Sequence, residues 1–106
     1  MSEVATKKLL ENDKVIVWEM VLEPGESTGL HTHEHDYIIQ VIDGSTLCAT
    51  DQSGGNPTDI EFLTDATLWL DVRDGEVALG DLRYSATHDA KNIGNARYRE
   101  ILVEIK

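Results

Sequence analysis

The chain has 106 residues, which suits one domain of ordinary size and is too short for two. Hydrophobic residues make up 41% of it, so it can form a core, but a domain this small buries only about 60–70% of its unfolded surface, and a homodimer would bury more. Twenty Asp and Glu residues against nine Lys and Arg residues give a formal charge of −11, which repels phosphate backbones and anionic lipids and argues against nucleic-acid or membrane partners.

The sequence contains no long apolar segment. Its longest strictly apolar run, VIVW (15–18), is far shorter than a bilayer span, and the first residues, MSEVATKKLLEND, lack the apolar stretch of a signal peptide. We therefore expect a cytoplasmic protein. Cys48 is the only cysteine, which excludes an internal disulfide and a zinc–thiolate cluster, and in STLCAT we expect a buried, unreactive thiol.

Short strands separated by turn residues are predicted from the N-terminus onward. Residues 1–13 are expected to form an N-terminal arm, with at most a helical turn or two in EVATKKLLEN, and residues 14–106 to form the domain. KVIVWEMVL (14–22) alternates apolar and polar residues until Pro24 and Gly25 end it. YIIQVI (37–42) precedes Asp43-Gly44, a strong hairpin signal, and STLCAT (45–50) precedes the turn DQSGGNP.

The second half continues this pattern through IEFL (60–63), TLWLDV (67–72) and EVALGDLRY (76–84), with a turn at RDGE (73–76). The last segment, ARYREILVEIK, puts Ile101, Val103 and Ile105 on one side and Glu100 and Glu104 on the other. Because period two dominates and the strands recur about every ten residues, the sequence predicts an all-β domain, an antiparallel barrel or sandwich.

Four large apolar side chains are assigned to the core: Trp18, Met20, Phe62 and Trp69. Trp69 alternates out of register with its apolar neighbours in TLWLDV, so a place in a dimer interface or on the opposite face of the sheet also stays open.

GLHTHEHDY (29–37) places histidines at 31, 33 and 35. In an extended strand, residues i and i+2 point to the same side, so His31 and His33 can bind one ion, and neutral imidazole is the form that binds metals. A histidine pair alone is a weak signal, because two exposed histidines at a strand end give the same pattern.

The surrounding spacing is more specific. Gly25 is followed by five residues, His31-Thr-His33, three residues, Tyr37, six residues and Gly44. This resembles the first motif of the cupin superfamily, in which glutamate stands at the position of Tyr37. HDAKN supplies His88 and Asn92 at the spacing that ends the second cupin motif, although VALGDLRYSATH lacks that motif's proline.

The resemblance extends from about residue 14 to the C-terminus and implies a small antiparallel jelly-roll β-barrel. It is closest to a group of small cupins that includes a protein associated with β-alanine degradation. By position, it implies a divalent transition metal (Fe, Ni, Mn or Zn) on His31, His33 and His88, with no carboxylate at Tyr37.

Several groups compete to complete this ligand set. Asp36 would need a bulge to turn inward, and His35 has the right parity but lies where cupins usually have a loop. Tyr37 is a poor ligand unless the metal lowers its pKa. Water is the remaining candidate. We single out Tyr37 as the candidate catalytic residue, against the alternative that it is a core aromatic with a satisfied hydroxyl.

Two functions follow from these residues. The first is a metal-dependent enzyme, of the dioxygenase or isomerase type, acting on a small organic acid or carbonyl compound. The second is a non-enzymatic cupin that binds or senses a small ligand. A third interpretation, a dimeric scaffold, predicts an apolar interior with no cavity near His88. Arg83 or Arg99 would add an anion-binding group if either points inward, and both are otherwise surface residues.

Overall fold

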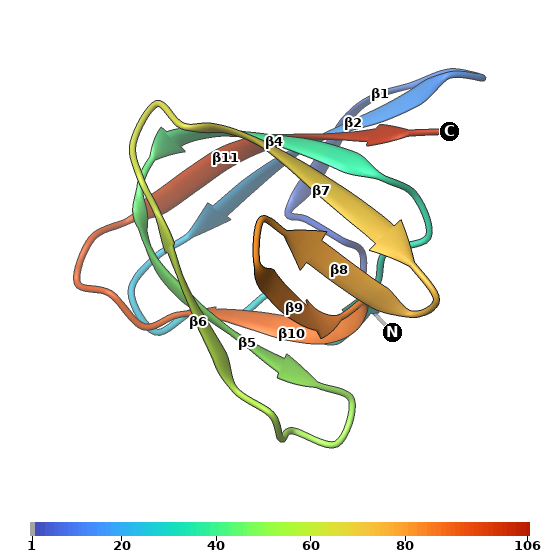
Figure 1. Cartoon of the computed structure of the whole chain (residues 1–106). Helices are drawn as coiled ribbons and strands as arrows, with labels where there is room; N and C mark the ends of the chain where they lie inside the picture. The colour runs from blue at the N-terminus through green and yellow to red at the C-terminus, as the bar shows by residue number, and fades with distance from the viewer. Residues whose placement is uncertain (1) are drawn as a thin grey trace.

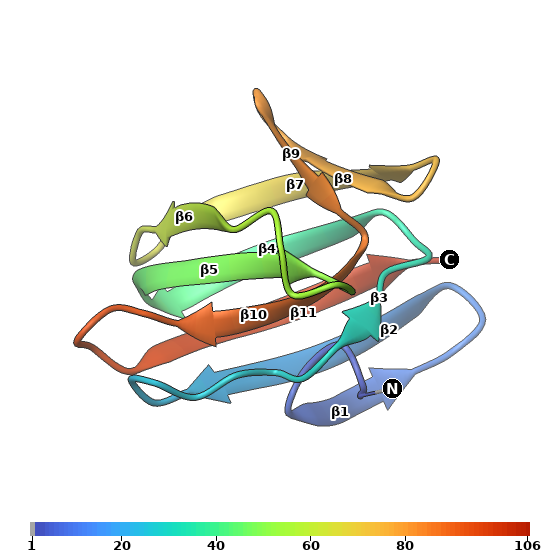
Figure 2. The same cartoon turned by 90° about the horizontal axis from the view of Figure 1, so that it is seen from below.

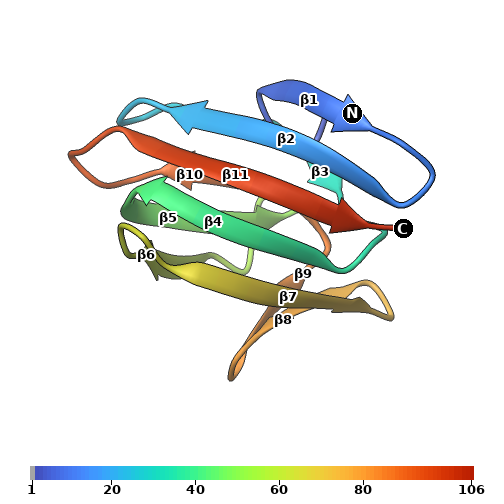
Figure 3. The same cartoon turned by 90° about the horizontal axis from the view of Figure 1, so that it is seen from above.

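The computed structural model describes residues 2–106, which form eleven β-strands and no helix. These residues therefore contain no helix that could span a membrane. The all-β prediction is confirmed. Two antiparallel sheets face each other (Figure 1), the smaller in front in the view from below (Figure 2) and the larger in front in the view from above (Figure 3).

The larger sheet has seven strands in the order β1-β2-β11-β4-β7-β8-β9. They are β1 (Lys7–Glu11), β2 (Val15–Leu22), β11 (Tyr98–Ile105), β4 (Tyr37–Asp43), β7 (Thr67–Arg73), β8 (Glu76–Leu79) and β9 (Leu82–Ser85). The smaller sheet has four strands, β3 (His31–Thr32), β10 (Thr87–Asn92), β5 (Ser45–Asp51) and β6 (Thr58–Phe62). The hydrogen bonding of the two sheets does not close into a continuous barrel.

The core lies between the sheets and follows the period-two pattern. On β2, the side chains of Trp18, Met20 and Leu22 point inward and are buried, whereas Glu19 and Val21 between them are only half-buried. The expected core positions of Trp18, Met20 and Phe62 are confirmed.

Trp69 does not lie in the core, because its side chain is 48% exposed. Its neighbour Leu70 is fully buried opposite Tyr37, and the alternation of β7 then turns Trp69 to the outer face, opposite Ile38. The prediction that Trp69 is a core residue is wrong, and its alternative on the opposite face of the sheet is confirmed.

Two other expectations need correction. Lys7–Glu11 forms β1, which pairs with β2, and no helical turn forms there. Part of the segment expected as an arm therefore extends the larger sheet. EVALGDLRY forms two strands, β8 and β9, because the chain reverses at Gly80, whose φ is +56°.

The turn between β4 and β5 requires glycine at position 44. A Cβ at this position would collide with the carbonyl oxygen of Phe62 and the amide of Thr64. The close approach of these backbones explains why the predicted Asp43-Gly44 turn suits this place. Gly25 needs its conformational freedom for another reason, because its φ of +88° lies in the left-handed region.

Candidate metal centre

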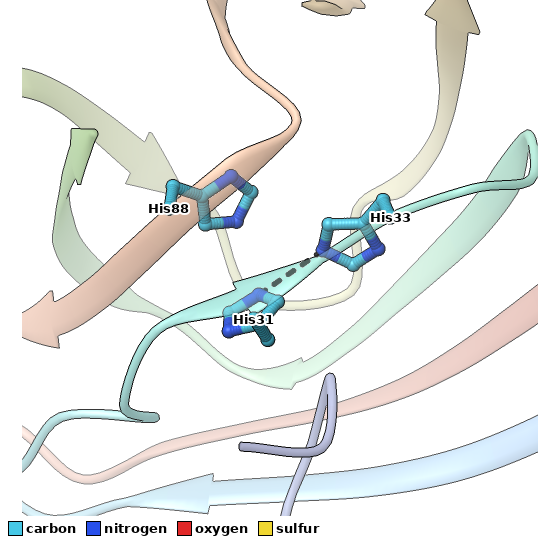
Figure 4. A group of neighbouring side chains, drawn as sticks. All are labelled: His31, His33 and His88. Carbon is cyan, nitrogen blue, oxygen red and sulfur yellow. Dashed lines mark hydrogen bonds between the residues drawn. The ribbon is translucent and has the colours of Figure 1, made fainter. Parts of the chain in front are cut away.

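The β3–β10 pair brings the three predicted histidines together. His31 lies directly opposite His88 in the antiparallel register. His33 lies just past the end of β3, where its amide donates to the carbonyl of Ala86 at 2.9 Å. Their side chains point toward one another (Figure 4), and all three are buried, with exposed fractions of 2–5%.

The ring nitrogens are close enough to share one ion. One nitrogen from each histidine lies within 4.8 Å of the others, and the Nε2 atoms of His31 and His33 are 3.2 Å apart. Two nitrogens bound to one zinc ion at about 2.0–2.1 Å are themselves roughly 3 Å apart. The spacing therefore fits two ligands of a single metal.

Backbone carbonyls fix the orientation of two of the rings. His31 Nδ1 lies 2.9 Å from the carbonyl oxygen of Gly29, and His88 Nδ1 lies 2.6 Å from that of Ser85. A carbonyl oxygen only accepts, so each Nδ1 carries the proton and each Nε2 keeps a lone pair for the metal. Asp89 holds Gly29 in turn, because its carboxylate accepts the Gly29 amide at 3.0 Å.

His33 differs from the other two histidines. Its Nδ1 is buried and has no hydrogen-bond partner within the described residues. The Nε2 atom of His33 faces that of His31, so Nδ1, on the other side of the ring, is the atom left without a partner among these residues to fix the proton. With the two oriented Nε2 atoms of His31 and His88, the His33 Nε2 completes a donor set that fits a divalent metal.

The surroundings keep the three imidazoles neutral. Burial lowers the pKa of His31, and burial together with the neighbouring imidazoles holds the pKa of His33 well below its ordinary value. Burial also lowers the pKa of His88 to about 4. Near neutral pH the rings therefore have the form that binds a metal.

Tyr37, at the position of the cupin glutamate, stacks on His33 with ring centroids 4.3 Å apart. Its hydroxyl is hydrogen-bonded to that of Tyr84. Burial, followed by the effect of Tyr84, raises the pKa of Tyr37 well above its ordinary value, so the phenol stays protonated. In this arrangement Tyr37 packs against the ligand set and holds a neutral hydroxyl beside it.

The other candidates for a fourth ligand lie elsewhere. Asp36 accepts the amide of Val72 at 2.8 Å, which ties the start of β4 to β7. His35 is half-buried in the bend before β4. Among residues 2–106, the histidines at 31, 33 and 88 form a group with metal-ligand spacing that neither of these residues joins.

A small cavity of about 40 Å³ adjoins the three histidines. Most of its wall is apolar, with contributions from Met20, Ile39, Leu47 and Leu102, and Glu100 adds a carboxyl group. The scaffold interpretation predicted no cavity near His88, and on this point it is wrong. Such a volume holds a few water-sized groups.

A wider pocket of about 460 Å³ is also lined by His88. Polar and charged residues line much of it, among them Asp51, Glu76 and Arg83. Arg83 is thus exposed near His88, and its guanidinium donates to the carbonyls of Gly80 and Leu82. Arg99 lies away from both pockets and pairs with Glu19 at 2.7 Å.

Comparison with solved structures identifies the architecture. A cupin domain from Bordetella pertussis superposes with a TM-score of 0.65 and 17% identity over 98% of both chains. The chain has the cupin fold. A cupin-family protein with a double-stranded β-helix from Methanocaldococcus jannaschii matches at a TM-score of 0.62 and 14% identity, over 93% of this chain and 76% of that chain.

Two further relatives have more specific descriptions. A predicted oxalate decarboxylase from Thermotoga maritima shares 24% identity at a TM-score of 0.50, over 85% of this chain and 64% of that chain. The β-alanine degradation protein BauB of Pseudomonas aeruginosa is 43% identical over 42 residues, 39% of this chain and 44% of that protein. The match thus spans less than half of the curated relative. No protein-family model matches the chain.

Proposed function

We propose that this cupin binds a divalent transition metal (Fe, Ni, Mn or Zn) on His31, His33 and His88 and acts on a small organic acid or carbonyl compound. The observation that carries the proposal is the convergence of three buried, neutral imidazoles, two of them oriented by backbone carbonyls. Three neutral ligands leave the ion its full 2+ charge, which attracts a carboxylate or an enolate. When bound, the metal would supply a Lewis acid for isomerisation or, if it is iron(II), the redox chemistry of dioxygenation.

The protein's own groups limit what reaches this centre. The apolar wall of the cavity excludes bulk water, and its volume restricts the reacting part of a substrate to a few atoms. We propose Tyr37 as the catalytic side chain, because its ring stacks on His33 in the cavity wall and its hydroxyl is neutral. Relatives whose descriptions mention oxalate and β-alanine support a small acid as substrate.

Metal analysis of protein expressed without a His-tag tests the proposal. We expect close to one ion per wild-type chain, and at least a tenfold loss of metal in His31→Ala, His33→Ala and His88→Ala. His35→Ala is the matched control, because this histidine lies in the same segment but outside the ligand group, and it should retain the metal. Metal-free wild-type protein, or equal metal content in all four variants, would rule the proposal out.

The alternative is a cupin that binds or senses a small ligand without turnover. The narrow cavity and the lack of a carboxylate in the ligand group found within residues 2–106 favour it. Oxygen uptake or product formation with a panel of small acids distinguishes the two functions. Turnover that is lost in His33→Ala would exclude a pure binder.

We also propose that this cupin forms a homodimer through the outer face of the larger sheet. Five apolar side chains lie in direct cross-strand register across it: Leu10, Val17, Val103, Ile38 and Trp69. In a chain with a net charge of −11, this row is uncharged. Of the acidic residues beside it on the same face, Glu19 is paired with Arg99 and Asp71 accepts the indole N–H of Trp69, so a second copy can pack on the row. A cytoplasmic location without nucleic-acid or membrane partners stays a prediction.

A further inference from the structure

Glu100 is a buried acid in the wall of the histidine cavity. It lies on β11, its side chain is 1% exposed, and it lines the same cavity as the three histidines. Sequence periodicity alone does not single it out, because Glu100 and Glu104 alternate with Ile101 and Val103 as surface glutamates would. Tyr98 and Leu102 share the face of the two glutamates, and that face turns inward.

Only one of the two carboxyl oxygens of Glu100 has a hydrogen-bond partner among the described residues. Its Oε1 accepts the hydroxyl of Tyr98 at 2.6 Å, whereas its Oε2 is buried and has no partner within residues 2–106. A buried carboxyl oxygen without a partner is costly, so the native state needs a reason to keep it. A ligand in the cavity would provide the missing hydrogen bond.

The groups around Glu100 favour its protonated form. Burial raises the pKa of Glu100 to about 7, and the hydrogen bond from Tyr98 opposes this effect only in part. The titratable groups that share its surroundings are the phenols of Tyr37, Tyr84 and Tyr98 and the three histidines, and the described cavity wall contributes no Lys or Arg. No cationic side chain of the described cavity wall therefore stabilises a carboxylate at Glu100. An anion bound to the metal would offset part of the 2+ charge and offer an acceptor, so the acid can act as a donor there.

We propose that Glu100 donates a hydrogen bond from Oε2 to a small oxyanion held at the histidine centre, and thereby selects compact carboxylates. This inference rests on the proposed metal centre and adds its recognition group. The 2+ charge attracts the anion on one side, and the neutral acid binds one of its oxygens on the other. A ligand of formate size suits the volume of about 40 Å³.

Formate binding to the zinc-loaded protein provides the test, with Glu100→Gln against Glu104→Gln. Glu104 is the matched control, because it is buried on the same face of β11, accepts Trp18 Nε1 at 2.6 Å and does not line the cavity. We expect all three proteins to bind zinc equally. Formate affinity, measured by calorimetry at pH 6.5, should fall about 10- to 100-fold in Glu100→Gln and stay within twofold in Glu104→Gln.

The pH dependence of formate affinity distinguishes a hydrogen bond donated by Glu100 from a packing contact. Formate stays ionised above pH 6, and ionisation of zinc-bound water affects all three proteins alike. The ratio of wild-type to Glu100→Gln affinity should therefore be largest below the pKa of Glu100 and fall as pH rises through it. Glu100→Met, which removes the carboxyl at similar length, serves as a second variant if Glu100→Gln does not fold.

Three results would overturn the inference. Equal formate affinity in wild-type and Glu100→Gln protein means that the acid does not contact the anion. Equal losses in both glutamine variants indicate a general structural effect. A loss of zinc in Glu100→Gln makes the carboxylate a ligand instead of a donor. If the wild-type protein binds no zinc, the proposed function fails first, and this inference fails with it.

Discussion

Tyr37 is the residue that most distinguishes this site from the cupin motif it resembles. The ring occupies the place of an anionic ligand and instead stacks on His33, with its hydroxyl engaged by Tyr84. Compared with the motif, an anionic carboxylate ligand is replaced by an uncharged aromatic ring that packs against His33. The affinity of the centre for a metal then depends on the three imidazoles alone.

Restoring the carboxylate tests this view. We expect Tyr37→Glu to raise zinc affinity about tenfold or more over Tyr37→Gln, because only the glutamate adds an anionic ligand. Without metal, both variants should lose about 2–4 kcal/mol of unfolding free energy from the lost ring, and the glutamate more, since its charge is buried. Chelator competition and thermal unfolding with and without zinc measure the two effects. Equal zinc affinities would show that position 37 does not reach the ion.

At the level of single residues, the sequence predicts the three histidines of the candidate metal centre but not the buried Glu100. Glycine and histidine spacing pairs His31 and His33 with His88, which lies 55 positions after His33 (88 minus 33), and the structure brings the three together. Glu100 is missed because a period-two pattern separates two faces without saying which one is buried. In β11 the glutamates lie inside and the isoleucines lie half-buried outside, against the usual hydrophobic order.

Among the elements, the strands with regular apolar alternation are predicted well and those that carry the site are not. β10 reads THDAKN, and its buried residues are His88, Ala90 and Asn92. Such a strand lacks apolar alternation because its inner face carries a histidine of the candidate metal centre, a small residue and an asparagine whose amide bonds the following turn. β3 has two residues, too few for any periodic signal.

Asn92 ties β10 to the turn that leads into β11, and its replacement should destabilise the fold. Its side-chain Nδ2 donates to the carbonyls of Leu22 and Ala96, and its Oδ1 accepts the amide of Gly94 and the hydroxyl of Ser45. We expect Asn92→Ala to lose about 2–4 kcal/mol of unfolding free energy, because buried groups are left unpaired.

Chemical denaturation measures this loss, with Asn95→Ala as the control. Asn95 is exposed in the same turn, so its replacement should change stability by less than about 0.5 kcal/mol. Equal stability of the two variants would mean that the Asn92 network contributes no net stability.

For the whole molecule, charge and shape favour one particular surface for self-association. The acidic excess discourages contact between most faces of two copies. The outer face of the larger sheet is the exception, because it carries the uncharged apolar row that runs from Leu10 on β1 to Trp69 on β7. The side chains at the two ends of the row are each nearly half exposed. The composition predicts the repulsion between two acidic copies. It does not predict the apolar row, because only the strand order brings Leu10 and Trp69, 59 positions apart (69 minus 10), into one line.

The oligomeric state tests this surface. We expect wild-type protein to sediment with twice the mass of one chain, and Trp69→Lys, which puts a charge at the end of the row, to weaken the dimer at least tenfold. Leu63→Lys is the control, because Leu63 is 61% exposed in the loop after β6, away from this face. A monomeric wild-type protein would exclude the dimer. Equal weakening by both lysines would place the contact elsewhere, since each substitution changes the net charge by the same amount, from −11 to −10.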